Sequence, residues 1–379
     1  MYHALLTARF KWPFTPLAIS LALGMVLALS LTACTPPLHK QQSYVFGTLV
    51  DVTIYGEEPA KAQRVTAQIF KDFDALHRTL HPWEAGTLER INGVLALASH
   101  DSPAKVSLPP GVIPLLQDAS RLSEQSEGLF NPAIGNLVRL WGFHSDTFAP
   151  RLPDAAAVQK WVHANPRMAD LHMEGLQLVG HNPAVRIDLG GYAKGYALDM
   201  AAAYLKSQGV NHALINIGGN VMALGKKGQD AWKIGIQHPR RAGALATLAL
   251  HDGEAVGTSG DYQRFFEING KRYSHLIDPR TGWPANQTQA VTVLIQPAHA
   301  SSNASTSTPA SELTKPGVLS DVASKPLFIA GPTDWPRLAK QMGVKHALFV
   351  RTDGTIDVTP AFNERLSWEK PVSPVRVIE

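Results

Sequence analysis

Three polar clusters lie within residues 256–284, which read VGTSGDYQRFFEINGKRYSHLIDPRTGWP. In chain order, their candidate functional residues are Ser259, Gly260 and Asp261, then His275, then Asp278 and Thr281. An imidazole titrates near neutral pH, so His275 is a candidate general base. Each cluster alone is also typical of a turn or of a satisfied structural group. Function is therefore indicated by the three clusters together, in this order, rather than by any one of them.

A β-hairpin is predicted between the first cluster and the other two. Residues 265–268, FFEI, lead into Asn269 and Gly270, and the residues KRY follow at 271–273. An Asn-Gly pair at this place suits a type I′ turn between two short strands. Such a hairpin would bring the first cluster near the other two.

A second block, RIDLGGYAKGYALD at residues 186–199, has the pattern of an anion site. An apolar strand end runs into two glycines and then into a helix whose inner face is expected to carry Tyr196, Met200 and Leu205. Backbone N–H groups at the helix start could face an anion, and a diphosphate is the anion we expect. The glycine spacing is not that of a P-loop or of a Rossmann fingerprint, so neither is predicted. The alternative is a glycine-opened helix with Lys194 in solvent.

Together these motifs resemble the ApbE family of FAD:protein FMN transferases. The family patterns are T-S-G-D-Y, matched at residues 258–262, K-R-Y-S-H-x-I-D-P-x-T-G, matched at 271–282, and D-x-x-x-x-A-K-G-Y-A-x-D, matched at 188–199. The resemblance covers roughly residues 43–355. It implies an α+β fold in which antiparallel sheets and packed helices hold FAD in a cleft.

The resemblance also implies which residues bind FAD. They come from the first strand, from loops and from the motifs above, and they are Phe46, Gly47, Thr48, Asn92, Trp141, Lys194, Gly218, Gly219, Ser259, Gly260, Asp261, His275, Asp278 and Thr281. His275 would be the catalytic residue. Without the resemblance, Asn92 would be a helix cap, Trp141 could equally be core packing, and the two glycines after 213–217 could form a tight turn.

A Mg²⁺ site is implied at Ala193, through its backbone, and at Asp321. Lys325 stands where the family has a Thr that contacts the metal, and Asn131 replaces the usual Asp of G-x-F-D-P-x-x-G. If residues 321–325 are helical, Asp321 and Lys325 lie one turn apart. The Lys325 ammonium could then partly occupy the position of the Mg²⁺ charge. The protein would then bind the metal more weakly than is usual in the family, or would use Lys325 as a fixed cation against the diphosphate. The alternative is that Lys325 points to solvent and a water completes the site.

The implied reaction moves FMN from FAD to a Thr or Ser hydroxyl of a partner flavoprotein of the cell envelope and releases AMP. Hydrolysis of FAD to FMN and AMP is a second possibility. A third, compatible with Asn131 and Lys325, is a lipid-anchored FAD-binding protein without turnover.

The N-terminal residues 1–33 are predicted to be a lipoprotein signal peptide. Arg9 and Lys11 precede an apolar run, and small residues lead to Cys34, the only cysteine in the chain and the predicted lipidation site. A short membrane anchor is the competing interpretation, although the run is shorter than the usual ~20 residues. Lipidation would place the protein on the periplasmic side of a bacterial envelope membrane.

The composition fits one large globular domain or two smaller ones. The chain has 379 residues, of which 45% are hydrophobic and 17% charged, and its net charge of +4 includes Arg9 and Lys11. No long Lys/Arg run is present, so no nucleic-acid site is predicted. We expect a tether at 34–42, a transferase domain at 43–360 with a flexible, low-complexity insertion at 297–318, and a C-terminal tail at 361–379.

Hydrophobic periodicity predicts most of the elements that would position the motifs. A strand is expected over 43–55, interrupted at 46–48, and helices over 60–80 and 111–125. Residues 151–180 are expected to be a polar insertion carrying one helix. Further strands are predicted at 213–217, 232–237, 245–250, 255–258 and 289–296.

Overall fold

A computed structural model describes residues 36–99, 101–145, 147, 149–298, 315–369 and 374–378. Cys34 and the whole predicted signal peptide therefore lie outside the described residues, as do residues 299–314 of the predicted insertion. Of the predicted C-terminal tail, residues 361–369 and 374–378 are described. The chain divides into two compact units, and everything below concerns the unit that begins at Leu38.

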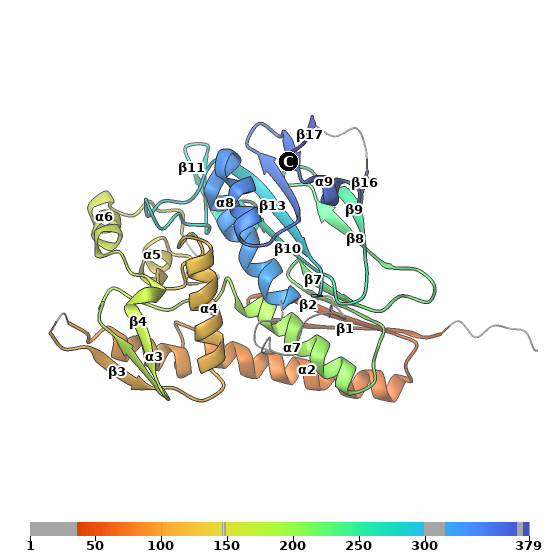
Figure 1. Cartoon of the computed structure of the whole chain (residues 1–379), viewed down its shortest axis with the longest axis horizontal. Coiled ribbons are helices and arrows are strands. Elements are labelled where there is room, and N and C mark those ends of the chain that lie inside the picture. The colour runs from red at the N-terminus through yellow and green to blue at the C-terminus, as the bar shows by residue number, and fades with distance from the viewer. Residues whose placement is uncertain are drawn as a thin grey trace, which may run out of the picture. The chain divides into compact units, whose positions relative to one another are not determined.

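The framework of this unit is one large sheet, shown in Figure 1. Within the described residues its strands are, in spatial order, β1 (Leu38–Val45), β2 (Thr48–Tyr55), β6 (Ala213–Ile217), β7 (Asn220–Leu224), β10 (Ala255–Gly260), β13 (Thr288–Ile295), β14 (His346–Arg351), β15 (Ile356–Val358) and β17 (Val375–Val377). Neighbouring strands are antiparallel except β15 and β17, which are parallel. The expected α+β class with antiparallel sheets is confirmed.

The large sheet is covered on both faces. Helices α2 (Pro59–Leu80), α7 (Ala193–Ser207) and α8 (Pro316–Gln341) cover one face, and a small antiparallel sheet of β8 (Trp232–Gln237), β9 (Ala244–Leu250) and β16 (Leu366–Trp368) covers the other. The alternation of side chains along a strand explains this arrangement. In β7, Met222 and Leu224 pack with α2 and α7, whereas Val221 and Ala223 pack with the small sheet.

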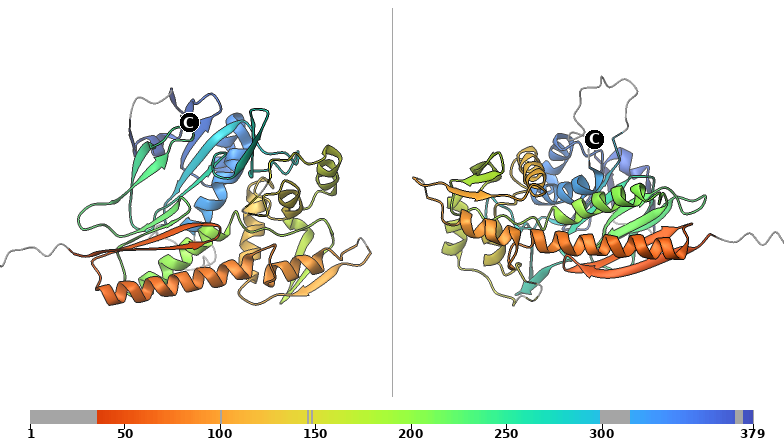
Figure 2. Two further views of the ribbon diagram at one scale, coloured as in Figure 1. Left: turned by 180° about the vertical axis from the view of Figure 1, so that it is seen from behind. Right: turned by 90° about the horizontal axis from the view of Figure 1, so that it is seen from below.

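Helix α2 confirms the prediction for residues 60–80. Val65, Ile69 and Phe73, spaced by four residues, are fully buried against the sheet and α7. Figure 2 shows α2 running alongside both α7 and the β1–β2 hairpin. Pro59 opens the helix, at a position where a missing N–H costs nothing.

The remaining elements belong to several packing groups, and one of them, α9 (Pro360–Asn363), packs against β14 of the large sheet. The others are α3 (Thr87–Leu95), α4 (Ile113–Gln125), α5 (Gly135–Leu140), α6 (Ala155–Ala164), the 3₁₀ turn η1 (Met168–Asp170), the sheet of β3 (Ala104–Ser107), β5 (Gln177–Gly180) and β4 (Leu171–Glu174), and the hairpin of β11 (Phe265–Ile268) and β12 (Lys271–Ser274). Residues 151–180 carry one α-helix as predicted, but also η1 and two strands. Four-residue strands are too short to give a clear alternation in sequence.

Two local predictions need correction. The interruption at 46–48 is not a break within one strand but the turn of a hairpin, with φ of 57° at Phe46 and 67° at Gly47. The inner face of α7 carries Ala197, Ala201 and Leu205, while Tyr196 and Met200 are only partly buried. Small residues face inward there because α7 is enclosed by α2, α8 and the sheet.

No helix within the described residues is both long and apolar enough to cross a membrane.

Candidate functional site

A cavity of about 1000 Å³ opens where several of the predicted motifs meet. Its walls include the turns after β1 and β6, the start of α7, β10 and the residues that follow it, and Lys325 and Ile329 of α8. The predicted site residues that line it are Phe46, Gly47, Thr48, Ala193, Lys194, Gly218, Gly219, His275 and Lys325. A cavity of this volume is large enough for a dinucleotide-sized ligand.

Two glycine-containing turns form one wall of the cavity. Gly218 and Gly219 have φ of 57° and 93°, a backbone conformation that other residues rarely adopt. A Cβ on Gly218 would lie 2.6 Å from the Thr48 Oγ1, so the turns after β1 and β6 pack directly on each other. Nothing lies within 4 Å of the Cβ position of Gly219, so this glycine leaves its side of the turn open.

The start of α7 brings Lys194 to the cavity, but its N–H groups are less open than expected. The N–H groups of Tyr192 and Ala193 both donate to the Leu189 carbonyl at 2.9 Å, and that of Gly195 donates to Asp321 Oδ2 at 2.9 Å. These three donors are therefore occupied within the chain. The charge that this helix offers to an anion is that of the Lys194 side chain.

A buried ion pair within α8 lies at this wall. Lys325 Nζ lies 2.6 Å from both the Oδ1 and the backbone carbonyl oxygen of Asp321, and the Lys325 side chain is only 16% exposed. Burial raises the pKa of Asp321, but the charges of Lys325 and Lys194 outweigh it and the pKa is lowered. Lys325 therefore turns toward Asp321 and the cavity, not toward solvent.

His275 lines the cavity and has one defined basic nitrogen. Its Nδ1 lies 3.1 Å from the Arg264 carbonyl oxygen, which can only accept, so Nδ1 carries the proton and Nε2 is the basic nitrogen. Burial, followed by the charges of Arg264, Lys194 and Lys325, lowers the pKa of His275 to about 3. The imidazole is thus neutral at physiological pH, as a general base must be before it takes a proton.

The hairpin that precedes His275 confirms the predicted turn. Asn269 and Gly270 have φ of 52° and 71°, as a type I′ turn requires, and β11 pairs with β12 from Phe265 to Ser274. The main-chain N–H of His275 donates to the Arg264 carbonyl at 3.0 Å, just beyond the paired strands. The hairpin thereby fixes His275 next to Arg264, which also lines the cavity.

Comparison with known proteins decides the family. The model of the ApbE family matches residues 46–349. This chain belongs to the ApbE family.

Similar proteins include an FAD:protein FMN transferase of Rhodobacter capsulatus, 39% identical over 350 residues, which are 92% of this chain and 62% of that protein. This chain thus spans less than two thirds of the length of that relative. An FAD:protein FMN transferase of Klebsiella pneumoniae is 36% identical over 262 residues, covering 68% of this chain and 77% of the relative. The crystal structure of the ApbE protein from Thermotoga maritima superposes with a TM-score of 0.74 at 26% identity, covering 87% of this chain and 99% of that one.

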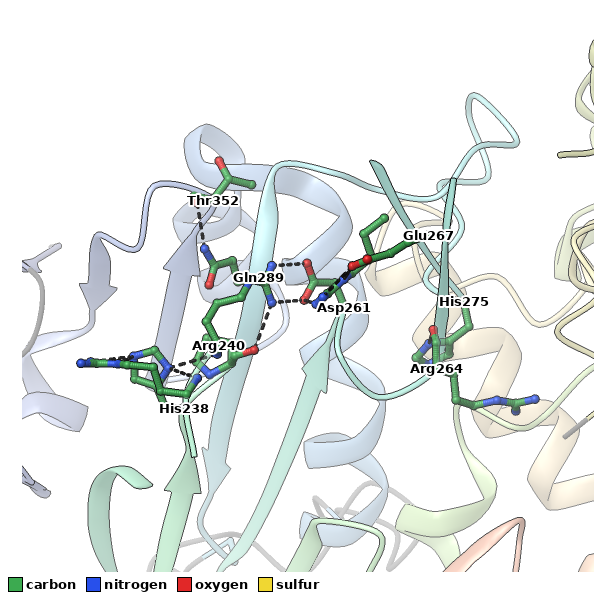
Figure 3. A network of polar contacts seen from close by, with 11 residues as sticks. His238, Arg240, Asp261, Arg264, Glu267, His275, Gln289 and Thr352 are labelled. Atoms are coloured by element: carbon green, nitrogen blue, oxygen red, sulfur yellow. Dashed lines mark hydrogen bonds and ion pairs between the residues drawn. The ribbon is translucent and has the colours of Figure 1, made fainter. Parts of the chain in front are cut away.

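Several residues implied by the ApbE resemblance do not line the cavity. Asp261 is held by Arg240, whose Nη1 and Nη2 lie 2.7 and 2.6 Å from the two carboxylate oxygens. Figure 3 shows Asp261 beside Arg240, with His275 and Arg264 apart from them. Ser259 is buried and its Oγ lies 2.8 Å from the Ser324 Oγ. Gly260 is also buried, at the end of β10.

Asn92 and Trp141 hold together segments that are distant in sequence. The Asn92 side chain donates to the Ile187 carbonyl at 2.8 Å and accepts from the Ile187 N–H at 2.7 Å. Trp141 is 1% exposed and its Nε1 donates to the Gly282 carbonyl at 2.8 Å. Both side chains support the elements around the cavity without facing it.

Asp278 and Thr281 lie in the loop after His275 and border a separate small pocket of about 360 Å³. The Asp278 carboxylate is paired with Arg280 at 2.8 Å, and the Thr281 hydroxyl accepts from the Trp283 N–H at 3.2 Å. In this arrangement they shape the loop that carries His275.

The structure adds cavity residues that are not among the predicted site residues. They include Asp188, Asn216, Gln237, Thr258, Tyr262 and Arg264. Asp188 is the first residue of the ApbE motif at 188–199, so that motif could have identified it. Its Oδ1 accepts from the Gly190 N–H at 2.8 Å. Gln237 and Asn216 come from strand ends with no motif of their own.

The residues at Asp321 do not fit the Mg²⁺ site that the ApbE resemblance implies. Such an ion needs several oxygen ligands at about 2.0–2.1 Å in octahedral geometry. Here Asp321 Oδ2 accepts from Gly195, while Oδ1 and the Asp321 carbonyl face an ammonium. Among the described residues, no group of three or more His, Cys, Asp or Glu side chains is placed to hold a metal ion.

Proposed function

We propose that this chain transfers FMN from FAD to a Ser or Thr hydroxyl of a partner flavoprotein and releases AMP. The observation that carries the proposal is the neutral His275 Nε2 in a cavity of about 1000 Å³ that also receives Lys194, Arg264 and Lys325. The names of the Rhodobacter capsulatus and Klebsiella pneumoniae relatives support it.

The cavity residues suit this phosphoryl transfer. The acceptor oxygen attacks the phosphorus next to the flavin, the bridging P–O bond of the diphosphate breaks, and AMP leaves with the bridging oxygen. His275 Nε2 accepts the hydroxyl proton. The cationic side chains offset the charge that develops on the diphosphate. Because the residues at Asp321 do not fit Mg²⁺, no step of this proposal passes through a metal ion.

We expect purified protein mixed with FAD and a Thr-bearing flavoprotein acceptor domain to give acceptor with in-gel flavin fluorescence and the mass increment of FMN. AMP should appear in equal amount. AMP with free FMN and no adduct would instead assign hydrolysis of FAD. Tight FAD binding with neither product would assign a binding protein and contradict the transferase.

We further propose that the mature protein is anchored by a lipid on Cys34 at the periplasmic side of a bacterial envelope membrane. The pattern of residues 1–34 supports this. Cys34→Ser is expected to abolish labelling by radioactive palmitate and to move the protein from the membrane fraction to the soluble one. Unchanged membrane association together with absent label would favour an uncleaved apolar anchor.

A further inference from the structure

The ammonium of Lys325 occupies the position at Asp321 where a cation would be bound. It lies 2.6 Å from Oδ1 and 2.6 Å from the backbone carbonyl of the same residue, while Oδ2 is taken by the Gly195 N–H at 2.9 Å. A divalent ion on Oδ1 would have to displace the ammonium, because two cations cannot share these oxygens at bonding distance. Asp321 is 1% exposed, so water cannot easily separate the pair.

The surroundings accommodate the lysine stem. A Cβ on Gly191 would lie 2.9 Å from Lys325 Cε and 3.0 Å from Cδ, so the glycine leaves room for the lysine to cross the wall of the cavity. Asp321 and Lys325 are four residues apart on α8 with the acid first, which is the favourable order for a helical pair. The neighbouring backbone and the helix spacing therefore both place the ammonium at this position.

Lys325 also shares the cavity with Lys194 and His275. The charges of both lysines contribute to the lowered pKa of His275, so the three groups act on the same space. An anion that enters this space meets two ammonium groups. Asp321 compensates one of these charges and holds it in place.

We propose that Lys325 is the resident cation of this site, which takes the place of a divalent metal ion at Asp321 and faces the diphosphate of FAD. FAD then binds without a divalent ion. The part of this inference that concerns FAD rests on the proposed function, whereas the exclusion of a metal ion from Asp321 does not.

The exclusion is tested by Mn²⁺ binding, followed by electron paramagnetic resonance on the purified full chain without FAD. We expect Lys325→Thr to bind Mn²⁺ about tenfold or more tightly than the wild type, because the Asp321 oxygens are released for the ion. Asp321→Asn in the Lys325→Thr background should remove the gain. Lys340→Thr, which removes an exposed lysine from the last turn of the same helix, should match the wild type. Equal Mn²⁺ affinity in the wild type and Lys325→Thr would overturn the exclusion.

The role toward FAD is tested by flavin fluorescence titration with excess EDTA or with Mg²⁺. The wild type should bind FAD within about twofold in the two conditions. Lys325→Thr should lose about tenfold or more in EDTA, the value of a charge-assisted contact, and recover in Mg²⁺. The wild-type titration needs no variant to fold: a loss of about tenfold in EDTA would overturn the proposed role. If the wild type binds no FAD in either condition, the proposed function fails, while the Mn²⁺ result still decides whether the ammonium excludes a metal.

Discussion

Replacing His275 with alanine is expected to lower the rate of flavin transfer by about 10²- to 10⁴-fold while FAD affinity changes little. The Nδ1 hydrogen bond to the Arg264 carbonyl makes Nε2 the proton acceptor, and alanine supplies no substitute. Single-turnover transfer to the acceptor domain and fluorescence titration of FAD measure the two quantities. His163→Ala, an exposed histidine on α6, is the matched control. A transfer rate within about threefold of the wild type would assign proton removal to another group or to water.

The pH dependence of kcat and kcat/KM should provide a second test of the role of His275. Because its pKa is lowered to about 3 in the unliganded protein, His275 should give no acid limb in kcat/KM between about pH 5 and pH 8. The diphosphate of bound FAD brings negative charge beside the ring and favours its protonated form. The acid limb of kcat should therefore lie at higher pH than that of kcat/KM. The same titration for both parameters would mean that the diphosphate does not approach His275.

Local sequence patterns were sufficient for the elements that carry the site. The four-residue spacing in α2 and the Asn269-Gly270 turn depend on neighbours in sequence, and both predictions are confirmed. The pairing of Asp321 with Lys325 also follows from the helical repeat. In each case the residues that determine the local structure are only a few positions apart in the sequence.

Which residues line the cavity depends on contacts that a local sequence pattern does not reveal. Along β10, Thr258 faces the cavity and Ser259 faces Ser324 on the opposite side, because successive side chains of a strand alternate. A motif match cannot tell which of two adjacent polar residues points inward. Asn92 bonds to Ile187, 95 residues later, so its structural use becomes visible only when the chain is folded.

The close contact of α7 with α8 is the other place where one substitution should have a large effect. Gly195 and Gly317 face each other: a Cβ on Gly195 would lie 2.3 Å from the Gly317 carbonyl oxygen and 2.8 Å from Asp321 Cβ. The Gly317 N–H in turn donates to Asp199 Oδ1 at 2.9 Å, which fixes the start of α8 on α7. Backbone atoms cannot rotate away as the end of a side chain can, so one helix would have to shift.

Gly195→Ala is therefore expected to destabilise the protein by about 3 kcal/mol, at the upper end of the cost of overpacking, although alanine is the better helix former. Gly93→Ala in α3, where nothing lies within 4 Å of the added Cβ, should be neutral or stabilise by up to about 1 kcal/mol. Urea unfolding measures both. Because Gly195 also donates to Asp321, the shift should move the Asp321–Lys325 pair and weaken FAD binding by more than the fraction of unfolded protein explains. Equal stability of the two variants would mean that α7 and α8 separate at little cost and do not hold this pair rigidly.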